Sequence, residues 1–198
     1  MKKAIFIDKD GTLISDVPYN VDPDKIVLTD GAVEGLRLLQ RKGYALIVIS
    51  NQAGVAHGYF AEEDLEPVIF RLHHLLGSAG ITLNGFYYCP HHPMGKLSQY
   101  TVSCNCRKPA PGMILKAAAD MNISLQASWM IGDILHDVEA GNRAGCQSVL
   151  INNGNETVWE MNEYSRPAYI AKDLLEAARL IINHSTANYS TWNSYISH

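Results

Sequence analysis

Residues 4–13 read AIFIDKDGTL, four apolar residues that run directly into two carboxylates and a glycine. A short continuous apolar run is typical of a strand buried on both faces of a parallel sheet. The run ends at Asp8, and Asp10 and Gly11 follow on a turn. Ligands of such sheets bind beyond the carboxyl ends of the strands. The two carboxylates therefore stand where a functional site is expected.

The rest of the chain repeats the alternation of short apolar runs and helical patterns. Further strands are expected at 44–49, 86–88, 129–131, 148–151 and 168–170, with helices at 33–41, 62–76, 113–121, 138–144 and 174–182. This order predicts an α/β domain with a three-layer, Rossmann-like, mainly parallel sheet. We assign residues 1–183 to this domain and the polar, aperiodic residues 184–198 to a C-terminal tail.

Composition narrows the class of partner. The 198 residues are 47% hydrophobic and carry a net charge of −4, with no Lys/Arg stripe of the kind that binds nucleic acid. No apolar stretch is long enough to span a membrane, and the N-terminus lacks the pattern of a signal peptide. We expect a cytoplasmic monomer that binds neither nucleic acid nor a membrane. A small phosphorylated partner is compatible with this composition, because a pocket needs only a few local positive groups.

Three later segments place polar groups at strand ends or beside them. The second strand leads into Ser50-Asn51-Gln52, whose hydroxyl and amides can bind phosphate oxygens. Arg107 and Lys108 precede a helix and could offset phosphate charge. The fourth strand ends in Gly132-Asp133, with Asp137 four residues later; a helix starting at Asp133 would put both carboxylates on one face. Asp8 and Asp133 would suit magnesium.

Each segment alone has an ordinary explanation: an acidic turn, a helix cap, a basic surface pair or an acidic helix start. Their succession at four strand ends favours a phosphate site. Only 39 residues separate Asp10 from Ser50 (11 through 49), and 57 separate Ser50 from Lys108 (51 through 107). Neither gap has room for a large cap domain, so we expect an open site.

Three of the four cysteines lie in one loop, 89–106, together with a histidine. Cys89, His91, Cys104 and Cys106 form a C-x-H…C-x-C set that suits a closed, tetrahedral zinc site. Buried cysteines with an incidental histidine are the alternative, and His92 leaves the choice of imidazole open. A zinc-closed loop would fix the following Arg107 and Lys108. Cys146 is expected in the core.

These motifs resemble the haloacid dehalogenase-like (HAD) phosphatase superfamily over about residues 4–182. The resemblance rests on Asp8-Lys9-Asp10-Gly11-Thr12, Ser50, Lys108 and Gly132-Asp133…Asp137. It implies that Asp8 is the nucleophile and Asp10 the general acid/base, with Ser50 and Lys108 binding the transferring phosphoryl group. It also implies Mg²⁺ held by Asp8, the Asp10 backbone carbonyl and Asp133, with Asp137 behind them orienting Lys108.

The zinc loop narrows the resemblance to two groups, the D-glycero-D-manno-heptose-1,7-bisphosphate 7-phosphatases and the histidinol-phosphate phosphatases. The long segment between His91 and Cys104 looks like the heptose group, in which Asn51, Arg107 and Lys108 would contact substrate. Two departures bear on the substrate. His57 stands where that group usually carries Arg, and Ile134 stands where a polar or basic residue is usual.

The resemblance therefore implies a Mg²⁺-dependent phosphatase that removes the 7-phosphate of the heptose bisphosphate through an aspartyl-phosphate intermediate. Such an enzyme would supply an intermediate for cell-surface polysaccharide, including lipopolysaccharide. Histidinol-phosphate phosphatase and a broader sugar-phosphate phosphatase are the enzymatic alternatives. A catalytically silent, zinc-stabilised binding module is the alternative from another class, although Asp8, Asp10, Lys108 and Asp133 are all present.

Overall fold

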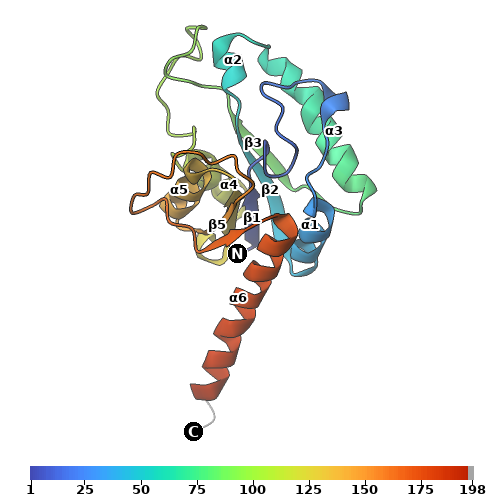
Figure 1. The fold of residues 1–198 in the computed structure, drawn as a ribbon, viewed down its shortest axis with the longest axis vertical. Coiled ribbons are helices and arrows are strands. Elements are labelled where there is room, and N and C mark those ends of the chain that lie inside the picture. The colour runs from blue at the N-terminus through green and yellow to red at the C-terminus, as the bar shows by residue number, and fades with distance from the viewer. Residues whose placement is uncertain (196–198) are drawn as a thin grey trace.

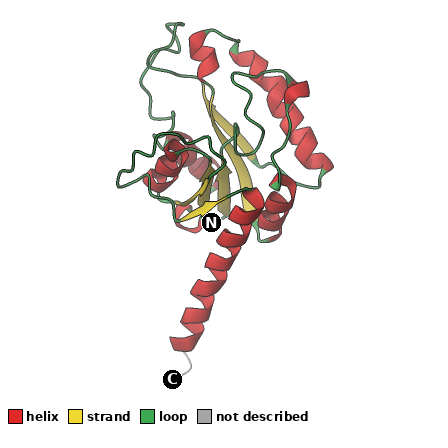
Figure 2. Cartoon of the chain, viewed as in Figure 1, coloured by secondary structure: helices red, strands yellow, loops and turns green. Residues whose placement is uncertain are grey.

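The computed structural model describes the backbone of residues 1–195 and the side chains of residues 1–184. Its centre is a six-stranded sheet with helices packed on both faces (Figures 1 and 2). The strands are β1 (Lys3–Ile7), β2 (Tyr44–Asn51), β3 (Gly85–Cys89), β4 (Trp129–Gly132), β5 (Gln147–Ile151) and β6 (Tyr169–Ala171). All neighbours pair in parallel, in the order β3-β2-β1-β4-β5-β6. The predicted three-layer α/β fold is confirmed.

Helices of two groups cover the two faces of the sheet. The helices are α1 (Ala32–Arg41), α2 (Ala53–His57), α3 (Leu65–Ser78), α4 (Gly112–Met121), α5 (Leu135–Ala144) and α6 (Leu174–Tyr195), with short 3-10 turns at Pro23–Lys25, Glu62–Asp64 and Leu125–Ala127. Buried side chains of α1, α3 and α6 share one apolar core with the sheet, and those of α4 and α5 share another. No further domain is inserted within residues 1–195, in keeping with the expected lack of a large cap.

Strand β1 supplies side chains to both cores. Ile5 and Ile7 join the core under α1, α3 and α6, whereas Ala4 and Phe6 join the core under α4 and α5. All four are fully buried. Alternate residues of a strand point to opposite faces, so a strand between two layers must be apolar at every position. This explains why a continuous apolar run, and not an alternating one, precedes Asp8.

Helix α6 differs from the expectation for the C-terminal segment. Its first turns pack against α1, where Gly35 lets the Leu174 carbonyl approach closely; a Cβ at this position would collide with it. The backbone then continues as helix to Tyr195 and projects from the domain (Figure 1). No Gly or Pro follows Leu174 to end the helix. Much of the predicted 184–198 tail is therefore helical, and residues 196–198 lie outside the described part.

Other element bounds differ by a few residues. Helix α2 falls within a segment expected to be a loop, because five residues are too few to show a helical period. Helix α5 begins at Leu135 and not at Asp133, which precedes the extended residue Ile134. The supposed i, i+4 relation of Asp133 and Asp137 within one helix is therefore wrong. Among the described residues, no helix combines the length and apolar character needed to cross a membrane.

The strand order fixes where a ligand can enter. Successive strands run outward from β1 in one direction to β3, and then from β4 in the other direction to β6. Parallel sheets with this order have a crevice at the point of reversal, outside the carboxyl ends of the two central strands. Here those ends lead into Asp8 after β1 and Asp133 after β4. The topology thus brings together two carboxylates that are 125 positions apart in the numbering of the chain.

Candidate active site

A cleft of about 300 Å³ lies at this crevice. It is lined by Asp8, Asp10, Asp16, Asn51, Lys108, Asp133, Ile134 and Asn155. Five of these are residues predicted for catalysis, magnesium or substrate, and they come from four separate segments of the chain. Larger hollows lie beside β3 and α4 and beside α5, but they contain none of the predicted catalytic residues. The predicted carboxylates and ammonium group therefore face one space.

Lys108 is the buried cation of the cleft. Its side chain is 3% exposed, and its ammonium group pairs with Asp8 and, at 2.6 Å, with Asp137. It also donates a hydrogen bond of 3.0 Å to the Ile49 carbonyl at the end of β2. Burial alone would lower the pKa of Lys108, but the two carboxylates outweigh it and raise the pKa above its usual value. The ammonium form is therefore held beside Asp8.

The basic side chains near the cleft do not balance the negative charge of its buried carboxylates. Burial raises the pKa of Asp8 to about 7, although Lys108 opposes the rise. Burial and the nearby Asp8 charge raise the pKa of Asp133 to about 6. Within the described chain, Asp133 has no ion pair with a basic side chain; its partners are neutral donors. A buried pair of carboxylates with this deficit is suited to a cation.

Two neutral donors orient Asp133. The Thr12 hydroxyl donates to one of its oxygens at 3.2 Å, and the Asn155 amide donates to the other at 2.6 Å. Gly11 permits this approach, because its φ is +82° and a Cβ would collide with Asp133 and Asn155. Sequence reasoning assigned no role to Thr12 or Asn155. Asn155 follows the tip of β5, so the rule used for the other strand ends could have found it.

The donor set fits magnesium. Carboxylate oxygens of Asp8, Asp133 and Asp137 lie within 4.8 Å of one another, and all three residues are buried. Asp137 is already engaged, because one oxygen pairs with Lys108 and the other accepts a 3.3 Å hydrogen bond from the Ile134 backbone. Asp8 and Asp133 line the cleft, whereas Asp137 does not, so these two are the carboxylates that face a ligand there. Hard oxygen ligands of this kind, completed by backbone carbonyls and water, are those that Mg²⁺ prefers.

Asp10 lies beside Asp8 and is held from two sides. The Lys9 ammonium group pairs with its Oδ1 at 2.7 Å, and the Gln52 amide donates to its Oδ2 at 3.2 Å. The same Gln52 nitrogen donates to the Ser50 hydroxyl at 2.6 Å. Ser50 is fully buried and does not line the cleft. The predicted role of Ser50 in binding the phosphoryl group stays a prediction.

The predicted substrate residues Asn51 and Arg107 have different settings. Asn51 lines the cleft, but its amide bonds reciprocally with the Lys108 backbone, accepting from the N–H at 3.0 Å and donating to the carbonyl at 3.1 Å. Arg107 lies outside the cleft lining, and its Nη1 is buried without a hydrogen-bond partner in the described part of the chain. Such an atom suits an anionic ligand group.

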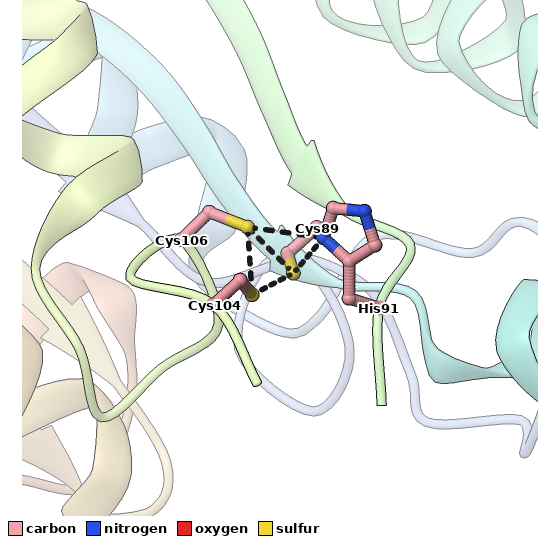
Figure 3. A group of neighbouring side chains, drawn as sticks. All are labelled: Cys89, His91, Cys104 and Cys106. Atoms are coloured by element: carbon pink, nitrogen blue, oxygen red, sulfur yellow. Dashed lines mark hydrogen bonds between the residues drawn. The ribbon is translucent and has the colours of Figure 1, made fainter. Parts of the chain in front are cut away.

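The predicted zinc ligands converge in one cluster beside the end of β3 (Figure 3). The Cys106 Sγ lies 3.0 Å from those of Cys89 and Cys104, and the His91 Nδ1 lies 3.4 Å from it. His92 instead accepts a hydrogen bond from the Met94 backbone, so its Nδ1 is engaged elsewhere. Three thiols and one imidazole on a common centre fit closed, tetrahedral zinc.

Of the three cluster cysteines, Cys104 is the one whose pKa is shifted toward the thiolate form. Burial raises the pKa of Cys104, but hydrogen bonds from the Cys106 thiol and the Arg107 backbone outweigh it and lower the pKa to about 7. Burial raises the pKa of Cys89 well above its usual value. Only the thiolate is a metal ligand. Cys146 is buried in the core under α4 and α5, as expected from the sequence.

The loop between His91 and Cys104 is held by contacts that no local pattern predicts. Both Glu62 oxygens accept hydrogen bonds, one from the Tyr88 hydroxyl at 3.0 Å and the other from the Tyr100 hydroxyl at 2.6 Å. The backbone N–H groups of Lys96 and Leu97 also donate to the Ala56 carbonyl of α2. The loop is therefore fastened both at the Cys/His cluster and to the segment after β2.

The two departures from the heptose pattern lie around the site. Ile134 lines the cleft. His57 ends α2, and its ring lies 4.7 Å from that of His92 and 5.5 Å from that of Tyr59, centroid to centroid. Tyr19 packs edge-on against Tyr59 at 4.6 Å. His57 therefore belongs to an aromatic cluster at the end of α2, at the position where the heptose group usually carries Arg.

A three-layer parallel fold with carboxylates and a buried lysine at its switch point defines a HAD-like phosphohydrolase architecture. Residues 105–177 match the HAD-hydrolase-like family model. The chain is 37% identical over 181 residues to D-glycero-beta-D-manno-heptose-1,7-bisphosphate 7-phosphatase of Pasteurella multocida. The aligned residues cover 91% of this chain and 97% of that protein. It is 40% identical over 152 residues to the protein of the same name from Escherichia coli, covering 76% of this chain and 80% of the other.

The structure is also similar to the D,D-heptose 1,7-bisphosphate phosphatase of B. bronchiseptica, solved with magnesium and phosphate. The TM-score is 0.75 at 26% identity, covering 92% of this chain and 99% of that one. The chain belongs to the HAD-like hydrolase family, and the relatives it matches over most of their length are heptose bisphosphate phosphatases. The predicted family and enzyme class, a phosphatase, are confirmed.

Proposed function

We propose that this chain is a Mg²⁺-dependent phosphatase that hydrolyses the 7-phosphate of D-glycero-D-manno-heptose 1,7-bisphosphate through an aspartyl-phosphate on Asp8. The observation that carries the proposal is the convergence of Asp8, Lys108 and Asp133 on one cleft at the switch point of the sheet. The names of the curated relatives support the substrate and specify its beta anomer.

In the first half-reaction, an Asp8 oxygen attacks phosphorus while the bond from phosphorus to the sugar oxygen breaks. Asp10 gives its proton to that leaving oxygen. In the second, a water oxygen attacks the phosphoaspartate and its proton passes to Asp10. The phosphorus bond to Asp8 then breaks, which releases inorganic phosphate and restores both carboxyl groups. Lys108, paired with Asp8 and Asp137, offsets charge on the phosphoryl oxygens.

Asp8, Asp133 and the Asp10 backbone carbonyl would hold Mg²⁺. When bound, the ion supplies positive charge that reduces repulsion between a phosphate dianion and the Asp8 carboxylate. The raised pKa values of Asp8 and Asp133 support this assignment, since they reflect buried carboxylates short of counter-charge. We propose that zinc closes the Cys89–Cys106 loop and takes no direct part in the reaction.

We also propose a cytoplasmic site of action in carbohydrate metabolism. The four cysteines are free, and three of them form the cluster suited to zinc. Thiols kept for metal binding suit a reducing compartment. A monomeric state stays a prediction.

The test is phosphate release by the purified protein with Mg²⁺ from the heptose bisphosphate, its 1-phosphate and 7-phosphate, and histidinol phosphate. We expect kcat/KM to favour the bisphosphate by about tenfold or more over each competitor. A preference for histidinol phosphate would overturn the substrate. Asp8→Asn should lower turnover by at least about 10⁴-fold, and unchanged turnover would overturn the mechanism. Asp24→Asn, at an exposed site, is the matched control.

A further inference from the structure

Lys9 is a buried charge that the proposed reaction does not use. It stands between Asp8 and Asp10 in the chain, and its side chain is only 3% exposed. Lysine at this depth is rare unless its ammonium group is paired. In the described part of the chain, its hydrogen-bond partner is the Asp10 Oδ1 at 2.7 Å. The ammonium group therefore pairs directly with Asp10, and its charge also acts on the nearby Asp16 carboxylate.

The second oxygen of Asp10 is held from another strand. Gln52, which follows β2, donates its amide to Oδ2 at 3.2 Å. Gln52 is itself buried and fixed, because its backbone N–H donates to the Cys89 carbonyl at 2.8 Å. The Asp10 carboxyl group thus has one donor on each oxygen, from two different elements. Rotation of the group about its last bond would break both contacts.

Stability alone does not account for the Lys9 arrangement. The Asp10 side chain is 32% exposed, so water can solvate its charge without a buried ammonium group. Burying a lysine carries a desolvation cost that an ion pair with a part-exposed partner offsets poorly. What the pair does supply is a fixed orientation for Asp10 at the rim of the cleft. Proton transfer depends on such orientation.

We propose that Lys9 is a positioning residue that fixes the Asp10 carboxyl group for proton transfer in both half-reactions, with Gln52 as its counterpart on the other oxygen. This inference rests on the proposed function. Lys9 does not touch the reacting atoms and acts through Asp10. Its loss should therefore slow the steps that need a proton and spare a step that needs none.

Two substrates separate these steps. The sugar phosphate releases an alkoxide that must be protonated, whereas 2,4-dinitrophenyl phosphate releases a phenolate that leaves without a proton. For Lys9→Met, we expect kcat/KM on the sugar phosphate to fall by about 10²-fold, the lower end for general acid catalysis. On the dinitrophenyl ester, kcat/KM should stay within about threefold of wild type, since it reports steps only through phenolate release.

The second half-reaction provides an independent test of the Lys9 role with the same dinitrophenyl ester. Its water needs Asp10 as a base, so kcat should fall in Lys9→Met although kcat/KM does not. Rapid-quench measurements should then show a burst of one equivalent of dinitrophenolate as phosphoaspartate accumulates. A residue that merely stabilised the fold would lower both parameters together and give no burst.

Three further variants secure the test. Lys9→Arg keeps a cation and should restore most of the lost activity on the sugar phosphate. Gln52→Leu removes the donor to the other oxygen and should give the same selective pattern at about tenfold, the effect of roughly one hydrogen bond to a charged group. Lys172→Met makes the same change at a lysine whose side chain is 78% exposed and should match wild type.

Equal losses on both substrates, or no loss on either, in Lys9→Met would overturn the proposal. If Lys9→Met does not fold, Lys9→Gln decides it, and a uniform loss across the two substrates in that variant overturns the proposal. Gln52→Leu does not decide it, because Gln52 also donates to the Ser50 hydroxyl. Failure of the proposed function is distinguishable, because it shows in the wild-type protein alone, which would then release no phosphate from the sugar bisphosphate.

Discussion

The two clusters suited to metals differ in chemistry and in access. The cleft cluster offers carboxylate oxygens, opens onto a space of about 300 Å³ and already contains a lysine that competes for its charge. The loop cluster offers three sulfurs and one nitrogen that face one another, with its four ligands sufficient for tetrahedral zinc. Oxygen ligands with space beside them serve a reaction, whereas a closed set of thiols serves to hold chain segments together.

Replacing Asp133 should disable the carboxylate cluster while leaving the Cys/His cluster intact. We expect the largest loss of activity here. For Asp133→Asn, we expect kcat/KM with Mg²⁺ to fall by roughly 10³-fold, since a bound cation contributes several kcal/mol to the transition state. Zinc content, measured by plasma mass spectrometry, should not change. Asp24→Asn is the exposed control. Loss of zinc in Asp133→Asn would show that the two clusters are not independent.

Replacing Cys104 should disable the Cys/His cluster while leaving the carboxylates of the cleft in place. Cys104→Ser should abolish zinc binding and lower the free energy of unfolding by several kcal/mol, because metal binding there contributes to folding. We expect activity at saturating Mg²⁺ to fall about tenfold, the lower end for residues that orient a site indirectly. Zinc content, urea unfolding and phosphate release measure the three effects.

The control for that experiment is the fourth cysteine. Cys146→Ala removes a buried thiol outside the cluster and should cost about 1 kcal/mol of stability while zinc and turnover stay as in wild type. Full zinc content in Cys104→Ser would contradict the assignment of the cluster.

Replacing Glu62 should alter the position of the loop between His91 and Cys104 without disabling either cluster. We expect the smallest effect here. Glu62→Gln can no longer accept from both Tyr88 and Tyr100 through charged oxygens, so the loop between His91 and Cys104 loses part of its attachment. We expect KM for the sugar bisphosphate to rise about fivefold, equivalent to ~1 kcal/mol. Zinc content and kcat on a small aryl phosphate should not change. Glu63→Gln, exposed and adjacent, is the control, and an equal rise there would refute the role of Glu62.

The site residues that lie at the ends of strands could be predicted from the sequence. A parallel strand covered on both faces is apolar through its centre, so Asp8, Ser50 and Asp133 could be found as the polar residues that follow apolar runs. The order of the strands then places Asp8 and Asp133 at one cleft, whereas Ser50 is buried outside its lining. Asn155 was missed only because the fifth strand end was not searched in the same way.

Other features could not be predicted from local patterns. The Glu62 contacts join a 3-10 turn to β3 and to the loop between His91 and Cys104, over 26 and 38 positions, and no periodic signal predicts such pairs. The pairing of Lys9 with Asp10 depends on the turn that buries Lys9. Helix α5 starts two residues after Asp133, a difference set by the extended conformation of Ile134. Helix ends of this kind are the least certain part of any sequence-based assignment.

The reciprocal bonds between Asn51 and the Lys108 backbone give Lys108 a second anchor that needs no metal. A mutation in the thiol cluster would therefore weaken the position of the ammonium group without releasing it. The partial loss of activity expected in Cys104→Ser, in place of a complete one, is the measurable consequence of this second anchor.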